Sequence, residues 1–238
     1  MGSPVPSPRS AEPPWRCERK FHGAGRSLAE VELALRTHPA HFHVVHPPRF
    51  VNNIYFDTPD LARFRTHIDG AAERMKLRVR WYGAARGPVT APVLERKARC
   101  GDVGSKLRVE LAPFRYEPGF DAEAVVGDAL ARVGDGLRAA ELAVSQPVLF
   151  NRYLRRYYLS ADARFRATVD SELHYETVVG RGAAARRSFA ERELVVIEIK
   201  YDPRDEERAA GVTGRLPFRL EKYSKYVAGT ARLAGVRI

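Results

Sequence analysis

The chain has 238 residues, 45% of them hydrophobic, and its 40 Lys and Arg against 29 Asp and Glu give a net charge of +11. This length and apolar content suffice for a real core, and the charge predicts an anionic partner such as nucleic acid, an acidic membrane or a phosphorylated small molecule. Cys17 and Cys100 are too few for a disulfide scaffold and lack metal-type spacing, which favours a cytoplasmic location. No apolar run approaches the ~20 residues of a membrane span, so no membrane segment is expected.

Composition also separates a leader from a folded region. Residues 1–14 are rich in Pro and Ser and are expected to be a disordered leader. Residues 15–238 are expected to form a single domain, because nothing in the sequence forces a division into two. Within that domain, the Ala/Gly/Arg tract at 180–187 is expected to be a hairpin loop.

Apolar periodicity predicts a strand-rich domain with a few helices. Strands are expected at 16–21, 52–57, 76–82, 93–99, 106–111, 148–159, 164–175 and 191–201. Helices are expected at 27–36, from about 58 to 69, within 121–143 with a break near 134–136, and over the basic stretch from about 213 to 234. Ser27 and Glu30 fit a capping box at the start of the first helix.

Charged residues alternate with apolar ones along several of these strands, so each strand has one charged face. The charged faces hold Lys76, Arg78 and Arg80; Lys106, Arg108 and Glu110; Arg164, Arg166, Thr168 and Asp170; and Glu198 and Lys200. A single such face is explained by a sheet with its wet side outward. Many together would line a lumen if the sheet closed, and that lumen could enclose a polyanion and a metal.

The positions of the lysines also favour a site for a polyanion. Seven of the 40 basic residues are Lys, and all lie in or beside strand-like motifs: Lys20, Lys76, Lys97, Lys106, Lys200, Lys222 and Lys225. A compact ammonium suits a point contact with a phosphate oxygen, whereas a planar guanidinium suits a bidentate one. The alternative is that the lysines cluster in strands by chance.

In their order and spacing, nine short motifs resemble the VTC domain, the polyphosphate polymerase branch of the triphosphate tunnel metalloenzymes. They are R-x-E-R-K at 16–20, N-I-Y-F-D-T at 53–58, K-L-R-V-R-W-Y-G at 76–83, L-E-R-K at 94–97, K-L-R at 106–108, N-R-Y at 151–153, R-A-T-V-D at 166–170, I-E-I-K-Y at 197–201 and S-K-Y at 224–226. The resemblance implies an α+β fold, a closed barrel of eight antiparallel strands with flanking helices. In that family the basic wall binds triphosphate and carboxylates hold Mg²⁺ or Mn²⁺.

The sister CYTH branch, which includes triphosphatases and some adenylate cyclases, shares the Y-F-D-T-P-D-L motif found here at 55–61. Its N-terminal signature is E-x-E-x-K, but this chain has Arg16 in place of the first Glu. The sequence also offers fewer lumen carboxylates than a hydrolase would use. Both differences favour the polymerase branch.

The resemblance and the alternation together give the expected site residues. Catalytic contacts are expected from Arg78, Arg80, Lys97, Arg152, Arg166 and Lys200, and substrate binding from Lys20, Lys76, Lys106, Arg108, Lys222, Lys225 and Tyr226. Fixed positive groups are the main requirement of phosphoryl transfer, because negative charge spreads over the oxygens of the transferring group. For each residue alone, the alternative is a solvated face or an ion pair between strands.

Carboxylates on the same faces are candidates for the metal. Glu198 is the expected metal ligand, because it lies between two isoleucines and should project into the lumen beside Lys200. Glu18, Glu95 and Glu110 are expected mostly to orient neighbouring cations. The sequence leaves the role of Asp170 open.

Three further groups of residues have competing explanations. His38, His41, His43 and His46 are expected to form a solvated Pro-containing connection, because no Cys or acidic residue nearby completes a metal site. Tyr55, Phe56, Trp81 and Tyr82 are expected to pack in the core or at the lumen rim, although an adenine could stack there. Lys222, Tyr223, Lys225 and Tyr226 are expected to form a helix that plugs one end of the tunnel.

The favoured function is a metal-dependent polyphosphate polymerase, a phosphotransferase that moves the terminal phosphoryl group of ATP or another triphosphate onto polyphosphate. One alternative is a triphosphatase of the same fold that acts on inorganic tripolyphosphate or on nucleoside or organic triphosphates. The other is a non-catalytic module that binds polyphosphate. Nucleic acid is the less favoured partner, because it would require a basic stripe on the outer surface.

Overall fold

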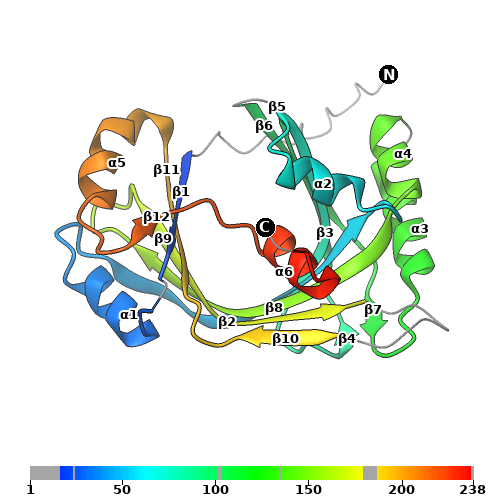
Figure 1. The fold of residues 1–238 in the computed structure, drawn as a ribbon, viewed down its shortest axis with the longest axis horizontal. Helices are drawn as coiled ribbons and strands as arrows, with labels where there is room; N and C mark the ends of the chain where they lie inside the picture. Colours follow the sequence, from blue (N-terminus) through cyan, green and yellow to red (C-terminus); the bar gives the residue numbers. More distant parts are fainter. Residues whose placement is uncertain (1–16, 24, 101–102, 135, 179–186, 237–238) are drawn as a thin grey trace, which may run out of the picture.

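One antiparallel sheet contains most of the strands, and helices pack on it, so the fold is α+β (Figure 1). The computed structural model describes residues 17–23, 25–100, 103–134, 136–178 and 187–236. The expected leader at 1–14 and nearly all of the expected loop at 180–187 lie outside these residues. No helix in the described part of the chain is long and apolar enough to cross a membrane.

The large sheet contains ten strands, and two short strands form a separate sheet. The ten strands are β1 Cys17–His22, β2 His43–Asp57, β3 Glu73–Tyr82, β5 Val93–Cys100, β6 Val103–Glu110, β8 Gln146–Leu159, β9 Arg166–Thr177, β10 Ser188–Glu191, β11 Val196–Tyr201 and β12 Arg219–Leu220. The short pair is β4 Gly87–Val89 and β7 Phe114–Tyr116. The helices are α1 Leu28–Arg36, α2 Ala62–Ile68, α3 Ala122–Val133, α4 Leu137–Ala143, α5 Glu206–Thr213 and α6 Lys225–Ala234, with a 3-10 turn at Pro203–Asp205.

The large sheet is a trough and not a closed barrel. Its strands follow the order β12-β1-β11-β9-β8-β2-β3-β5-β6, with β10 paired to β9, and no pairing among the described residues joins β6 back to β1. Figure 1 shows two arms of the sheet, with β1 and β11 in one and β5 and β6 in the other, and α6 between them. At one end of β1, the edge that a closed barrel would need is taken by β12, which pairs with Phe21 and His22.

Apolar side chains pack on both faces of this sheet. On the outer face, α1 and α5 cover a cluster that includes Val31 and Ile197, and α3 and α4 cover another that includes Trp81. On the inner face, α6 packs on a third cluster that includes Tyr175 and Tyr226. The inner face of the trough therefore combines this apolar cluster with the charged strand faces.

The caps at the start of two helices are encoded in the sequence. The expected capping box of α1 is confirmed, since the Ser27 side chain accepts from the Glu30 N–H and Glu30 accepts from the Ser27 N–H. The expected helix from about 213 to 234 is wrong over its first half. There the chain ends α5 at Thr213, passes through β12 and begins α6 only at Lys225, after the N-cap Ser224. Pro217 lies in this interval and lacks the N–H that a continuous helix would use.

The histidine-containing connection also differs from expectation, because β2 begins at His43 and not near residue 52. Bulges between β2 and β8 occur on either side of His46, and the second spans Pro47 and Pro48. His38 is buried, and its Nε2 atom lies 2.9 Å from the Val212 carbonyl oxygen. Among the described residues, no group of three or more His, Cys, Asp and Glu could hold a metal ion.

Candidate functional site

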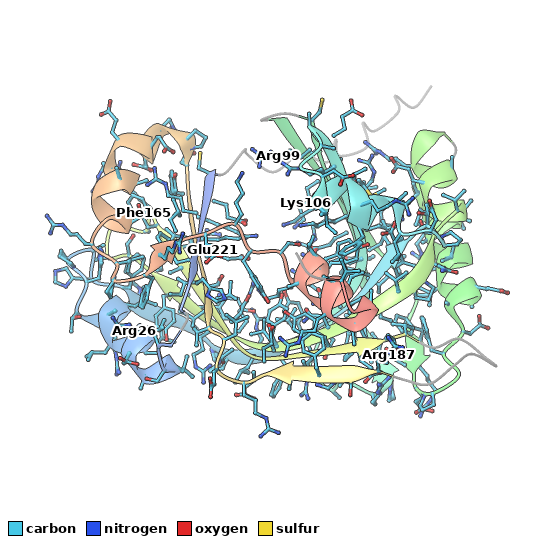
Figure 2. All side chains as sticks on the ribbon, viewed as in Figure 1. Arg26, Arg99, Lys106, Phe165, Arg187 and Glu221 are labelled. Atoms are coloured by element: carbon cyan, nitrogen blue, oxygen red, sulfur yellow. The ribbon has the colours of Figure 1, made fainter. Side chains whose placement is uncertain are left out.

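The inner face of the trough gathers charged side chains from seven strands and from the start of α6. They are Glu18 and Lys20 of β1, Lys76, Arg78 and Arg80 of β3, Glu95 and Lys97 of β5, Lys106 and Arg108 of β6, Arg155 of β8, Asp170 of β9, Glu198 and Lys200 of β11, and Lys225 of α6. Figure 2 places Lys106 on the arm formed by β5 and β6, toward the opposite arm. Cations outnumber carboxylates in this set, so the face carries a net positive charge.

Glu95 is the centre of one half of this cluster and is only 2% exposed. Arg78 Nε and Nη2 donate to its Oε2 atom at 2.8 and 2.6 Å, and Arg80 Nη1 lies 3.5 Å from the same oxygen. The other oxygen, Oε1, lies 3.1 Å from Lys106 Nζ and 3.7 Å from Arg108 Nε. Burial alone would raise the pKa of this carboxyl, but Arg78 and its neighbours hold it well below its usual range.

Glu198 is the centre of the other half. Its carboxylate oxygens lie 3.6 Å from the charged nitrogens of Lys20, Lys200 and Arg155. Glu18, on the neighbouring strand, lies 2.9 Å from Lys20 Nζ and 3.4 Å from Lys200 Nζ. Burial alone would raise the pKa of Glu198, but the nearby cations, led by Lys200, hold it well below its usual value. Glu198 is therefore ionised in this cluster.

Asp170 joins the sheet to α6. Its two oxygens accept from Arg155 Nε and Nη2, each at 2.6 Å, and Lys225 Nζ lies 2.6 Å from Oδ2. Asp170 is fully buried and Lys225 is 9% exposed, so the contact is internal. The role that the sequence left open for Asp170 is thus an ion-pair clamp that fixes Arg155 and the first residue of α6.

Two lysines in the cluster, Lys76 and Lys97, are influenced more by neighbouring cations than by neighbouring carboxylates. Lys76 Nζ donates to Ser224 Oγ at 2.8 Å, and no described carboxylate lies within ion-pair distance of Lys97. Burial, together with Lys20 and Arg78, lowers the pKa of Lys76 to about 7. Lys97 is exposed at the surface of the trough, but the protein atoms packed around it, together with Arg78 and Lys200, lower its pKa to about 7. A bound anion would strongly stabilise the protonated form of such amines, because it would supply the negative charge that their surroundings lack.

The structure does not bring Arg152 to this face. Arg152 pairs with Asn52 of β2, and its guanidinium lies 3.7 Å from the centroid of the Phe50 ring, on the side of β8 opposite to Tyr153. Arg155, which sequence reasoning missed, takes the place in the cluster that Arg152 was expected to fill. The N-R-Y motif led to the choice of Arg152. Alternation along the strand places Arg155 on the same inner face as Tyr153.

Three other expected residues lie apart from the cluster or in different surroundings. Lys222 is exposed in the segment between β12 and α6, and therefore does not share a helix with Lys225. Tyr226 is 1% exposed, donates its hydroxyl to Asp57 and stacks on Tyr55, so it anchors α6 in the core and is not placed to contact substrate. Arg166 lies on the inner face opposite Lys200 but is exposed at the start of β9.

Solved structures share this fold at low sequence identity. A protein from Pyrococcus horikoshii OT3 is 15% identical, with a TM-score of 0.51 and coverage of 90% of this chain and 97% of that chain. A candidate adenylate cyclase from Vibrio parahaemolyticus is 11% identical, with a TM-score of 0.50 and coverage of 90% and 98%. Another from Bacillus halodurans is 12% identical, with a TM-score of 0.50 and coverage of 87% and 92%.

The family itself is shown by sequence. No curated protein matches the chain. The family model of the VTC domain matches residues 16–234, which is nearly the whole chain. This confirms the resemblance carried by the nine motifs, and the chain belongs to the VTC domain family.

Proposed function

We propose that this protein is a metal-dependent polyphosphate polymerase, which transfers the terminal phosphoryl group of ATP to a polyphosphate chain held in the trough. The observation that carries the proposal is the uncompensated positive charge around Lys76 and Lys97, whose pKa values are lowered to about 7. A ligand with several closely spaced negative charges would supply what this cluster lacks. Triphosphate and polyphosphate have that property.

The reaction would break the bond between the terminal phosphorus of ATP and its bridging oxygen, which leaves with the electron pair on ADP. A terminal oxygen of polyphosphate would form the new bond to the same phosphorus. The charge that spreads over the transferring oxygens would be stabilised by Arg78, Arg80, Lys97, Arg155 and Lys200. No proton needs to be removed, because a terminal phosphate oxygen of polyphosphate is already ionised near neutral pH.

The engagement of the carboxylates favours a phosphate acceptor over water. Each buried carboxylate of the cluster is already in contact with at least two cations: Glu95, Asp170 and Glu198. Their pKa values are lowered, so none is suited to take a proton from water. A triphosphatase needs water to be activated, whereas a polymerase only needs two anions to be held together.

The residues present fit a divalent cation that is bound jointly with substrate. Glu198 and Glu18 are carboxylates on paired strands, and Mg²⁺ or Mn²⁺ is commonly held by one or two carboxylates together with phosphate oxygens. The described residues offer no cage of three or more ligands, so the remaining ligands would come from the phosphates and water. Such a cation would offset negative charge on the bridging and terminal oxygens.

The decisive experiment is to incubate the purified protein with ATP and Mn²⁺ or Mg²⁺ and to separate the products on a polyacrylamide gel stained for polyphosphate. We expect long-chain polyphosphate and stoichiometric ADP. Release of orthophosphate without polymer, at every ATP and metal concentration tested, would assign the protein as a triphosphatase. Tight binding of polyphosphate without either product would assign the protein as a non-catalytic module that binds polyphosphate.

A further inference from the structure

Beyond the cations, the inner face of the trough carries a stacked group of aromatic and guanidinium side chains. Arg49 lies between two tyrosine rings, with its guanidinium carbon 4.9 Å from the ring centroid of Tyr82 and 4.8 Å from that of Tyr157. Tyr82 is 49% exposed although it is large and apolar. His46 meets the edge of the Tyr157 ring at 5.6 Å between centroids. We name Arg49, Tyr82 and Tyr157 the stacked triad.

Two residues of the stacked triad lie on the same strands as cations that we propose to bind phosphate. Tyr82 lies two residues beyond Arg80 on β3, and Tyr157 lies two residues beyond Arg155 on β8. Residues two apart on a strand share a face and are separated by about 7 Å. That spacing is comparable to the distance between the phosphates of a nucleoside triphosphate and its base.

One unpartnered hydroxyl lies between the triad and the cations. Thr168, on β9, pairs with Tyr157 of β8 on one side and with Glu198 of β11 on the other. Its buried Oγ1 atom has no hydrogen-bond partner among the described residues. A buried polar atom in this condition requires an explanation, and a ligand that brings a polar group is one. In a nucleotide, the sugar hydroxyls lie between the base and the phosphates.

We propose that Tyr82, backed by Arg49, is the platform on which the nucleobase of the phosphoryl donor stacks; this rests on the proposed function. Arg49 packs against the ring of Tyr82 and restrains it, and nearly half of the tyrosine remains exposed to receive a second planar group. Every base has a flat π-face, so the platform accepts purine and pyrimidine triphosphates, with larger purines held more tightly. Inorganic tripolyphosphate has no base and gains nothing from this platform.

The test compares ATP with inorganic tripolyphosphate, because the two ligands share the phosphates and differ in the base. Their dissociation constants are measured by calorimetry with divalent metal chelated, for the unmodified protein and for Tyr82→Ala and Tyr82→Phe. Tyr82→Phe keeps the ring and serves as the conservative variant. Leu33→Ala removes an exposed apolar side chain from α1, away from the trough, and is the matched control.

We expect Tyr82→Ala to weaken ATP binding by about 5- to 150-fold, the range that corresponds to about 1–3 kcal/mol of base stacking. Tripolyphosphate binding by the same variant should change less than about twofold, and Tyr82→Phe and Leu33→Ala should resemble the unmodified protein for both ligands. Equal effects of Tyr82→Ala on both ligands, or no effect on either, would overturn the platform and leave the proposed function standing. Failure of the unmodified protein to bind either ligand would overturn both.

Discussion

Both Nε and Nη2 of Arg78 donate to one oxygen of Glu95, at 2.8 and 2.6 Å, while the second oxygen of that carboxylate faces Lys106. One buried carboxylate thus holds together β3, β5 and β6, the strands of one arm of the trough. Without it, these strands would bring several cations together with no negative charge between them. The arm depends on this contact for its charge balance.

Glu95→Gln should therefore destabilise the protein strongly. Removing one partner from a buried ion pair leaves an uncompensated charge and costs about 3–5 kcal/mol. Chemical denaturation monitored by circular dichroism would measure the loss. Saturating tripolyphosphate should raise the melting temperature of the variant more than that of the unmodified protein, because the ligand replaces the lost charge. A loss below about 1 kcal/mol would contradict the role given to Glu95.

Arg80 and Arg152 provide a direct test of which face binds phosphate. Arg80 contacts Asn53 and Tyr153 on the inner face, so Arg80→Ala should weaken tripolyphosphate binding by about 1.5–3 kcal/mol, as for a lost charge-assisted hydrogen bond. Arg152→Ala should leave the affinity within about twofold, because Arg152 lies on the opposite face. Calorimetry on both variants checks this. Comparable losses in the two would place the binding face elsewhere.

Alternation in the sequence correctly grouped the charges of β3, β6 and β11, because each of these strands continues without a bulge through its charged residues. The expectation for β8 came instead from the N-R-Y motif, which pointed to Arg152. Alternation along β8 places Arg152 on the face opposite to Tyr153 and Arg155. The extra residue in the register shift between β8 and β9 lies on β9, so it does not change the faces of β8.

Long-range contacts explain the other differences between the expectations from sequence and the structure. The position of Lys222 outside α6 depends on the pairing of β12 with β1, which joins residues almost 200 positions apart in the sequence. The burial of Tyr226 depends on its contacts with Tyr55 and Asp57, which the S-K-Y motif cannot show. Each of these features is decided by a partner distant in the chain.

Binding should weaken as the pH rises, because Lys76 and Lys97 have pKa values lowered to about 7. Above pH 7 both amines are mostly neutral in the free protein, and a bound polyanion favours their protonated forms. Binding therefore takes up protons, and the affinity for tripolyphosphate should fall by up to about tenfold per pH unit for each amine.

Calorimetry between pH 6.5 and 9, in two buffers with different ionisation enthalpies, would measure both effects. Lys97→Arg keeps the positive charge at every pH in this range, so it should show a smaller fall and less proton uptake. The ionisation of the ligand is the same in both proteins and cancels in the comparison. Proton release on binding by the unmodified protein would refute this account.

Glu198→Gln should separate metal use from binding. The amide keeps the size of the side chain but removes the charge that would help to hold a divalent cation, so turnover should fall by about 100-fold or more. Nucleotide binding, measured with metal chelated, should persist because the surrounding cations remain. Turnover should be followed over a range of Mn²⁺ concentrations. Near-normal turnover at saturating metal would rule out Glu198 as the ligand.

Gly229 determines how closely α6 can approach the sheet. A Cβ atom at this position would lie 2.8 Å from Tyr175 Cε1 and 3.0 Å from Leu149 Cδ2, and Tyr175 is fully buried and stacked on Phe189. Gly229→Ala should destabilise the protein by about 1–3 kcal/mol, the usual cost of overpacking. Gly211→Ala is the control, because a Cβ at that helical position meets nothing within 4 Å. Equal stability of the two variants would show that α6 lies less close.

The absence of pairing between β1 and β6 in the described part of the chain has a consequence for how a long polymer would be handled. A closed tunnel accepts a linear polymer only by one end, so the chain must be threaded through and cannot leave until that end has passed. The trough is open along one side, and a polyphosphate chain can enter or leave it laterally at any point of its length. Synthesis in such a site is expected to be distributive, with products of many lengths from the earliest times and no small set of very long chains.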